Sequence, residues 1–268
     1  MKIFVCIKQV PGISEVKIDP KTNTLIREGV ESILNPNDRN ALEMALVLKE
    51  EQKAEVIALT MGPPQAEEIL REALAMGIDK GVLLSDRAFA GADTLATSYT
   101  LALAIKKFMK ESDSEENYLI ICGSQAVDGD TGQVPPELAE ELGIPQITYV
   151  QKLKLSEDRI VVERKFRATE IVVIETKLPA LISVLTDINK PRFPTMMGIM
   201  KAYENSNVIY FDSKNLNADI SKIGLNGSMT EVNKIFFPER NGKRIILEGS
   251  PEEVVKKLCH HLQEDKIL

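Results

Sequence analysis

The stretch that decides the fold is residues 118–142, YLIICGSQAVDGDTGQVPPELAEEL. Residues 118–122 form a short apolar run that is typical of a strand buried on both faces. A glycine-bearing loop, residues 123–132, follows, and residues 135–142 then favour a helix with proline in its first turn. A buried strand, a loop and a helix in this order are the repeating unit of α/β proteins with a parallel sheet.

The same unit repeats on the N-terminal side of this stretch. The predicted strands are residues 2–7, 55–60 and 81–84. The predicted helices begin at Asn35 or Asn37 (either of which can cap), follow Pro64 as far as Gly77, and span residues 92–109. We therefore expect an α/β fold with a doubly wound, largely parallel sheet that is covered by helices on both faces.

After Gly143 the pattern changes. Strand-like segments with short turns between them follow at residues 147–154, 159–164, 170–176 and 180–185, which predicts an antiparallel excursion beside the parallel sheet. Beyond Thr186 the sequence indicates irregular structure, and residues 215–242 are rich in Asn, Ser and Gly. Residues 251–264 repeat apolar residues at helical spacing. We predict an α/β domain over residues 1–222 and an extended C-terminal arm over residues 223–268.

Composition excludes several classes of protein. The 33 Lys and Arg against 40 Asp and Glu give a net charge of −7, which argues against a nucleic-acid binder. No apolar run approaches the ~20 residues that span a bilayer, and the first apolar run is too short for a signal peptide. Three widely spaced cysteines suit reduced thiols in a cytoplasmic protein. The two histidines, His260 and His261, are adjacent, so we expect no metal site and no histidine-based triad.

Ligands of an open parallel sheet bind beyond the carboxyl ends of the strands, where the strand order reverses. Four segments should gather there: residues 6–10, 35–38, 61–64 and 123–134. The last offers glycines, a threonine hydroxyl and backbone N–H donors before a helix, which suits a pyrophosphate. Asp128 and Asp130 could shape the turn or accept hydrogen bonds from ribose hydroxyls. Because the loop has neither Walker nor GxGxxG spacing, a glycine-rich turn without a ligand is the alternative.

Five blocks resemble, in family order, those of the β subunit of electron-transfer flavoproteins. They are FVCIKQVPG, LNPNDRNALEMALVLKE, ALTMGPPQAEEILREALAMGIDKGVLLSD, ICGSQAVDGDTGQVPPELAEELGIPQITYV and KLPALISVLTDINKPRFPTMMGIMKA, between Met1 and about Ala202. The resemblance implies a heterodimer with an α subunit, against which the arm would pack. It also implies that the four segments hold a nucleotide.

Two kinds of β subunit exist in this family. One holds structural AMP, and the other holds FAD and takes part in electron bifurcation in anaerobic metabolism. Residues 88–98, AFAGADTLATS, resemble the FAD-containing type, and so do residues 13–27. This resemblance implies that FAD takes hydride from NADH. One electron would then go to ferredoxin or flavodoxin, and the other through the FAD of the α subunit to an acyl-CoA or hydroxyacid dehydrogenase.

Such a subunit oxidises NADH only within the complex with its α subunit and dehydrogenase, and it needs no catalytic side chain, because the flavin does the redox chemistry. The alternatives are a non-bifurcating β subunit that holds AMP and docks the dehydrogenase, and a free-standing nucleotide hydrolase or ligase. The sequence shows no metal-binding or phosphate-clamping Lys motif for the latter.

The predicted cofactor-binding residues are Cys6, Asn35, Asp38, Met61, Gly62, Asp93, Thr94, Thr97, Gly123, Gln125, Ala126, Val127, Asp128, Gly129, Asp130, Thr131, Gly132, Gln133 and Val134. Asp93 and Thr94 could instead act only as N-caps of a helix. Ser124 stands where family members commonly carry Arg or Lys, so a positive side chain is missing at that position. Cys6 and Cys122 lie in apolar strands and are expected to be buried, inert thiols.

Residues 189–201, NKPRFPTMMGIMK, are too apolar for a solvated loop. Methionine side chains are flexible and polarizable, and so suit a surface that docks another protein. The family resemblance places the dehydrogenase-recognition loop here, with Met196 near its anchoring position. The predicted docking residues are Pro191, Phe193, Met196, Met197, Ile199 and Met200. A loop packed on the core of its own chain is the alternative.

Overall fold

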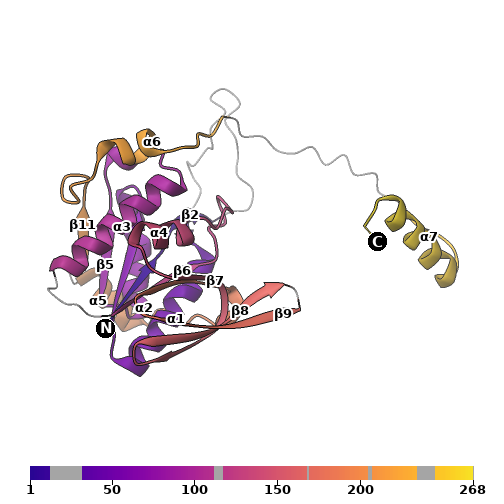
Figure 1. Ribbon diagram of the computed structural model, residues 1–268, viewed down its shortest axis with the longest axis horizontal. Coiled ribbons are helices and arrows are strands. Elements are labelled where there is room, and N and C mark those ends of the chain that lie inside the picture. The colour runs from indigo at the N-terminus through magenta and orange to yellow at the C-terminus, as the bar shows by residue number, and fades with distance from the viewer. Residues whose placement is uncertain (13–31, 112–116, 168, 205–206, 234–244, 268) are drawn as a thin grey trace. The chain divides into compact units, whose positions relative to one another are not determined.

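A nine-stranded sheet runs through the computed structural model in the order β11-β5-β4-β1-β6-β10-β7-β8-β9 (Figure 1). The strands are β1 Lys2–Cys6, β4 Glu55–Met61, β5 Lys80–Leu84, β6 Tyr118–Gly123, β7 Gln146–Ser156, β8 Arg159–Arg167, β9 Glu170–Lys177, β10 Ala180–Val184 and β11 Val208–Phe211. Neighbours from β11 to β7 are parallel, and β7–β8 and β8–β9 are antiparallel. The predicted parallel α/β sheet with an antiparallel excursion is confirmed.

The structure describes residues 1–12, 32–111, 117–167, 169–204, 207–233 and 245–267. The block at residues 13–27 that resembles FAD-containing subunits lies outside these ranges, and so does part of the predicted arm. The chain divides into two compact units, Met1–Asn233 and Lys234–Leu268. In the described part of the chain, no helix has the length and apolar character needed to cross a membrane.

Helices cover both faces of the sheet (Figure 1). One face carries α1 Pro36–Gln52, α2 Glu67–Met76 and α5 Met196–Glu204, and the other carries α3 Thr94–Glu111, α4 Val134–Leu142 and α6 Gly224–Gly227. The alternation of side chains along β1 shows why two layers are needed. Ile3 and Val5 lie in the first core and Phe4 and Cys6 in the second, and all four are buried. The doubly wound arrangement follows from strands that are apolar on both faces.

Shorter elements complete the first unit. A separate antiparallel pair is formed by β2 Gln9–Pro11 and β3 Ser32–Leu34. Single 3₁₀ turns are η1 Pro64–Ala66, η2 Arg87–Phe89, η3 Thr186–Ile188 and η4 Ile220–Lys222.

The prediction of irregular structure beyond Thr186 is wrong in two places. Residues 196–204 form helix α5, and residues 208–211 form strand β11, which pairs with β5. A Cβ atom on Gly198 would lie 2.2 Å from the carbonyl oxygen of Ala75, so only glycine lets α5 approach α2 this closely. The sequence masked the helix because Pro194 and Gly198 bracket its first turn.

Two further segments lie differently from the expectation. Strand β10, predicted within the antiparallel excursion, returns to the sheet and pairs in parallel with both β6 and β7. Leu216, from the stretch rich in Asn, Ser and Gly near the end of the predicted domain, and Ile223, the first residue of the predicted arm, are both buried in the core beneath α3. Residues 215–227 therefore belong to the packed structure of the first unit.

The second unit contains helix α7 Pro251–Glu264, as predicted. A capping box starts it: the Glu253 amide donates to Oγ of Ser250, and the Ser250 amide donates to Oε2 of Glu253. None of its residues is buried, and Val255 and Leu258 remain 58% and 46% exposed. The apolar stripe of α7 is therefore not covered by the described residues of its own unit.

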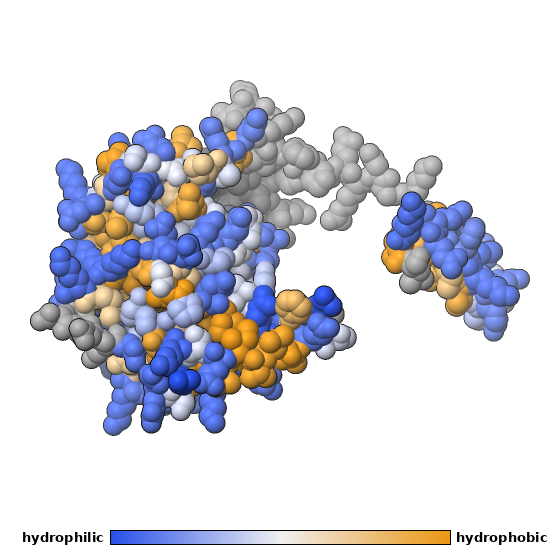
Figure 2. All heavy atoms as spheres, viewed as in Figure 1, coloured by the Kyte–Doolittle hydropathy of each residue, from blue (hydrophilic) through white to orange (hydrophobic). Residues whose placement is uncertain are grey.

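Apolar side chains also gather over the β8–β9 extension (Figure 2). Strand β9 forms one edge of the sheet, and its consecutive residues Ile171, Val172 and Val173 are all exposed, as is Phe166 of β8. An exposed apolar edge strand leaves backbone groups open to pairing with another chain.

Candidate functional site

The strand order of the sheet reverses between β1 and β6. From β1 the chain builds β4, β5 and β11 on one side, while β6, β10 and β7 lie on the other. The two strands end at Cys6 and Gly123, and crevices at such switch points are where open α/β sheets bind ligands. We use the name cradle for residues 6–8, 35–38 and 123–134, which meet at this point.

Side chains at the start of α1 bind the backbone of the cradle loop. Nδ2 of Asn35 donates to the carbonyl oxygen of Gln125 at 2.9 Å, and its Oδ1 accepts from the amide of Val127 at 3.2 Å. Nδ2 of Asn37 donates to the same carbonyl oxygen of Gln125 at 2.8 Å. As expected, Asn35 is the N-cap residue of α1, but its side chain makes no capping hydrogen bond to the helix and, like that of Asn37, binds the loop.

Asp38 lies buried beneath the loop. Its Oδ2 accepts from the amide of Lys8 at 2.8 Å, and a Cβ atom on Gly123 would lie 2.4 Å from its Oδ1, so no larger residue fits there. Burial raises the pKa of Asp38 to about 7, although hydrogen bonds from Asn35 and from the amides of Lys8 and Gly123 act in the opposite direction. This carboxyl group joins the ends of β1 and β6 to α1.

The cradle contains a cation that the sequence analysis did not assign. Nζ of Lys8 lies 2.8 Å from both carboxylate oxygens of Asp128 and so brings a positive charge to the outer part of the loop. The available signal was that Lys8 is the first charged residue after a buried strand at the switch point. Nε2 of Gln125 donates to Oδ1 of Asp130, so both aspartates shape the loop.

The outer part of the loop faces solvent. Residues 127–131 are exposed, and Val127 is 51% exposed although it is apolar. Helix α4 begins at Val134, and its next two residues are Pro135 and Pro136, which have no backbone N–H. The donors available to an anion here are therefore mainly amides of the loop, with little from the first turn of α4.

The start of α3 is bonded to a distant part of the chain. Oδ1 of Asp93 accepts from the amide of Ala96 at 3.0 Å and caps the helix. Its Oδ2 accepts from the amides of Met229 and Thr230 at 2.8 and 3.0 Å and from Oγ1 of Thr230 at 3.1 Å. Burial raises the pKa of Asp93, but these hydrogen bonds outweigh that effect and hold the pKa below its usual value. We call residues 228–230 the strap.

Other polar groups of α3 face α4. Oγ1 of Thr94 donates to Oε1 of Glu137 at 3.1 Å, and Oγ of Ser98 donates to the carbonyl oxygen of Val134 at 3.3 Å. These contacts bring the start of α3 beside the end of the cradle loop. Neither Glu137 nor the strap was predicted, and the sequence carries no signal for them, because both pair with α3 across long stretches of chain.

The remaining predicted residues lie at the end of β4 and in the first turn of α3, outside the cradle. Met61 ends β4 beside β1, and the amide of Gly62 donates to the carbonyl oxygen of Leu84 at 3.0 Å. The Thr97 amide donates within the first turn of α3, to the carbonyl oxygen of Asp93.

The two strand cysteines meet at the same edge of the sheet. Cys6 pairs in register with Cys122, and both are buried as expected. The hydrogen bond with Cys6, together with burial, raises the pKa of Cys122, so its thiol stays protonated.

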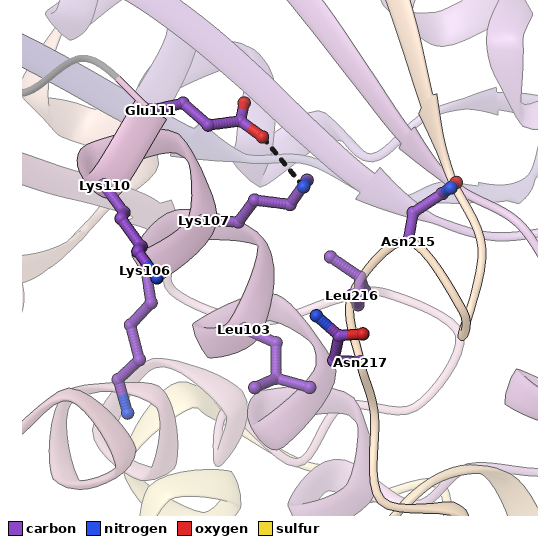
Figure 3. Close-up of a pocket in the computed structure, with 8 residues that line it drawn as sticks. All are labelled: Leu103, Lys106, Lys107, Lys110, Glu111, Asn215, Leu216 and Asn217. Carbon is purple, nitrogen blue, oxygen red and sulfur yellow. Dashed lines mark ion pairs between the residues drawn. The ribbon is translucent and has the colours of Figure 1, made fainter.

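A cavity of about 480 Å³ lies elsewhere on α3 (Figure 3). It is lined by Leu103, Lys106, Lys107, Lys110, Glu111, Asn215, Leu216 and Asn217, and Lys107 pairs with Glu111 at 2.8 Å. It shares no residue with the cradle. Its lysines occupy the far end of α3 from Thr94, so this hollow does not belong to the predicted nucleotide site.

The predicted docking residues lie on the surface at α5. The exposed fractions are 83% for Phe193, 75% for Met196, 61% for Met197, 42% for Ile199 and 50% for Met200. Pro191 precedes them and is partly buried. We call these six residues the docking surface. Their side chains do not enter the core of this chain.

Comparison with known proteins gives consistent results. The model of the electron transfer flavoprotein domain matches residues 22–208. The electron transfer flavoprotein subunit beta of Megasphaera elsdenii is 46% identical over all of both chains. The caffeyl-CoA reductase-Etf complex subunit CarD of Acetobacterium woodii is 47% identical, and the acryloyl-CoA reductase electron transfer subunit gamma of Anaerotignum propionicum is 42% identical, each again over the full length of both chains.

Proposed function

The chain belongs to the electron transfer flavoprotein family as a β subunit, and from this premise we propose that it pairs with an α subunit and holds FAD in the cradle. The observation that carries the proposal concerns the loop at the β1–β6 switch point. The side chain of Asn35 binds the backbone of this loop, while residues 127–131 of the loop are exposed to solvent. FAD, when bound, would accept hydride from NADH and deliver one electron to ferredoxin or flavodoxin and the other, through the FAD of the α subunit, to a dehydrogenase.

The donor set of the cradle suits a dinucleotide. Backbone amides of residues 131–134 would donate to phosphate oxygens, whereas those of Gly129 and Asp130 already donate to the carbonyl oxygen of Ala126, and Lys8 supplies a positive charge beside the loop. Asp128 and Asp130 would accept from ribose hydroxyls. Asn35, Asn37 and Asp38 would hold the loop in place rather than bind the nucleotide, because their polar groups already bind the backbone of this chain.

A second candidate, structural AMP, is favoured by a separate observation. Asp93 and Thr94 belong to the block that resembles FAD-containing subunits, yet their side chains bind the strap and Glu137. A shorter nucleotide would occupy only the cradle loop and leave these contacts intact. FAD would extend to the start of α3 and meet them.

Identification of the bound nucleotides decides between FAD and AMP. The β subunit is co-produced with its α subunit, the heterodimer is purified, and nucleotides released by denaturation are quantified by chromatography and mass spectrometry. We expect two FAD per heterodimer. One FAD and one AMP would establish the second candidate, and a single nucleotide per heterodimer would contradict both. The variant Gly123→Ala, whose added Cβ meets Asp38, should empty the β site, and the nucleotide of the α subunit serves as the internal control.

The second unit supplies part of the proposed pairing. Helix α7 has a capped start and an apolar stripe but no buried residue. An isolated helix of this length is marginally stable in water, so a covering surface is needed. We propose that the α subunit provides it, and that residues 234–268 become protected from proteases only in the heterodimer. Equal protection in the isolated β subunit would contradict this.

The docking surface is proposed to bind an acyl-CoA-type dehydrogenase, with a hydroxyacid dehydrogenase as the alternative. The names of two relatives refer to caffeyl-CoA reductase and acryloyl-CoA reductase, which supports an acyl-CoA substrate for the partner. Five exposed apolar side chains on one short stretch suit an anchor that is buried on binding.

Truncation of one anchor tests this proposal. In the heterodimer, Met196→Ala should weaken affinity for the dehydrogenase that the heterodimer reduces by about 1–2 kcal/mol, because the side chain leaves a desolvated contact. Met229→Ala is the matched control, since Met229 is 82% exposed and lies outside the docking surface. Calorimetric binding and the melting temperature are measured on both variants. Unchanged affinity of Met196→Ala would remove the docking assignment.

A further inference from the structure

The chain segment that leads into the docking surface is fastened to α1. Nδ2 of Asn40 lies 3.0 Å from the carbonyl oxygens of Thr186 and Asn189 and from Oδ1 of Asn189. Nδ2 of Asn189 donates in return to the carbonyl oxygen of Asn40 at 2.9 Å. Two asparagines thus bind each other's backbone across 149 positions of sequence.

Arg192 makes the second fastening. Its amide and Nε each lie 2.9 Å from Oε2 of Glu43, and its Nη2 lies 3.0 Å from Oε1 of the same carboxylate. Nη1 reaches Oε1 of Glu50 at 2.5 Å. The Glu43 side chain is 9% exposed and that of Glu50 is 62% exposed. The contact with Glu43 is therefore a nearly buried, bidentate pair, and only arginine has the planar fork that it requires.

This pair sets the direction of the next residues. Arg192 is bound through both its backbone amide and its guanidinium, and Phe193, the adjacent residue, is 83% exposed. Pro191 and Pro194 on either side restrict the backbone further, because the ring of proline fixes φ. A segment held at position 192 therefore presents Phe193 and the start of α5 in one orientation.

The same helix also holds the cradle. Asn35, Asn37 and Asp38 at the start of α1 bind the cradle loop, and Asn40 and Glu43, within the next turns, bind the segment before the docking surface. The cradle and the docking surface are thus both attached to the same rigid helix, α1.

We propose that Arg192 is a positioning residue for partner recognition, which through Glu43 fixes the docking surface to the helix that carries the cradle. The proposal rests on the docking function proposed above. Arg192 itself does not anchor the partner, because its guanidinium is occupied by two carboxylates of its own chain. Its loss leaves every apolar side chain of the docking surface in place but no longer in one orientation.

Affinity for the dehydrogenase, measured on the full heterodimer, tests the proposal. Arg192→Met should weaken binding about ten-fold, and Arg192→Lys should weaken it nearly as much, because lysine keeps the charge but not the fork. Glu50→Gln, which removes only the exposed partner, and Arg159→Met, which removes an exposed arginine pair on β8, are the controls and should change affinity less than two-fold. The nucleotide content of the β site should stay the same in all four.

A double-mutant cycle separates positioning from general stability. When the docking surface is no longer oriented, Met196→Ala should cost less in the Arg192→Met background than in the native chain. Hydrogen exchange of residues 189–204 should accelerate in Arg192→Met, while that of residues 123–134 should not. Should Arg192→Met fold poorly, Glu43→Gln, which keeps the shape of the partner, is measured in its place.

The outcomes distinguish the positioning role of Arg192 from the docking function itself. Native affinity in Arg192→Met or additive losses in the cycle, with Met196→Ala weakened as expected, would overturn the positioning role and leave the docking function standing. Native affinity in Met196→Ala would overturn the docking function itself. A lower melting temperature with unchanged affinity would show that Arg192 only stabilises the fold.

Discussion

The two walls of the candidate nucleotide site use their polar groups in opposite ways. On the β1–β6 side, side chains below the loop bind its backbone and leave its outer residues exposed. On the α3 side, Asp93 and Thr94 bind the strap and Glu137. In the sequence, the polar residues of both walls were predicted to bind the ligand. The difference teaches that a polar residue at the edge of a sheet is available to a ligand only to the extent that its own chain leaves donors or acceptors of the side chain unused.

The carboxyl group below the loop should show the largest effect. The pKa of Asp38 is about 7 in the folded chain, against about 3.9 for an aspartate in solution. This group therefore stabilises the folded state most below pH 4, and the contribution is lost as pH rises to 7. The difference in free energy of unfolding between the native chain and Asp38→Asn should shift by about 4 kcal/mol over this range. Denaturant titrations at several pH values measure it, and a difference independent of pH would show that burial does not neutralise Asp38.

Asp93 should behave with the opposite sign. Its pKa is lowered in the folded chain, so its contribution is present above pH 4 and is lost as pH falls below that value. Asp93→Ala removes the acceptor of four hydrogen bonds and should cost about 2 kcal/mol at pH 7. Asp219→Ala is the matched control, since Asp219 also caps a helical turn by accepting from a backbone amide, that of Ser221, but lies exposed, and a smaller loss is expected. Equal losses in the two variants would show that the strap contacts add nothing.

Lys8 tests the open wall directly. Its ion pair with Asp128 is half exposed, so Lys8→Met should change the free energy of unfolding by less than about 1 kcal/mol. The loss of a cation beside the loop should nevertheless weaken nucleotide binding about ten-fold. Lys49→Met, which breaks a similar pair with Asp79 away from the cradle, should leave binding unchanged. Equal nucleotide affinity in both variants would mean that no phosphate lies near Lys8.

Thr94→Val gives the smallest and most selective effect. If FAD reaches the start of α3, loss of the hydroxyl should weaken FAD binding by roughly three-fold, which is less than 1 kcal/mol. AMP binding should not change, because a mononucleotide stays within the loop. Affinities for both nucleotides, measured on stripped heterodimer, give the answer. Identical effects on FAD and AMP would contradict a boundary between the two walls.

Much of the fold was predictable because it depends on local pattern. Strands β1, β4 and β6 are apolar on both faces and lie between turn residues, so their runs stand out in the sequence. Strand β11 could not be recognised in the sequence, because its four residues, which include the exposed Tyr210, resemble any short apolar run. Helix α5 could not be recognised either, because its apolar side chains face solvent, whereas a stripe of buried apolar residues is the usual signal of a helix.

The candidate site likewise has one part that the sequence predicts and another that it does not. That residues 123–134 meet residues 35–38 followed from the rule for parallel sheets, without any knowledge of contacts. The partners of Asp93 come from positions 229 and 230, and no local pattern predicts a bond across that separation. Lys8 lay within a predicted segment but was not singled out, because a lone lysine after a strand is common.

The place of β10 in the sheet has a consequence for how the chain is made. One edge of β6 stays open while residues 124–179 are synthesised, because its partner there, β10, comprises residues 180–184. Strand β5 waits longer still, since β11 comprises residues 208–211. Pairings between such distant segments are slow to form, and both edges can bind other chains in the meantime. Cells that produce this subunit rapidly should therefore need chaperones to shield the growing sheet until its last strand arrives.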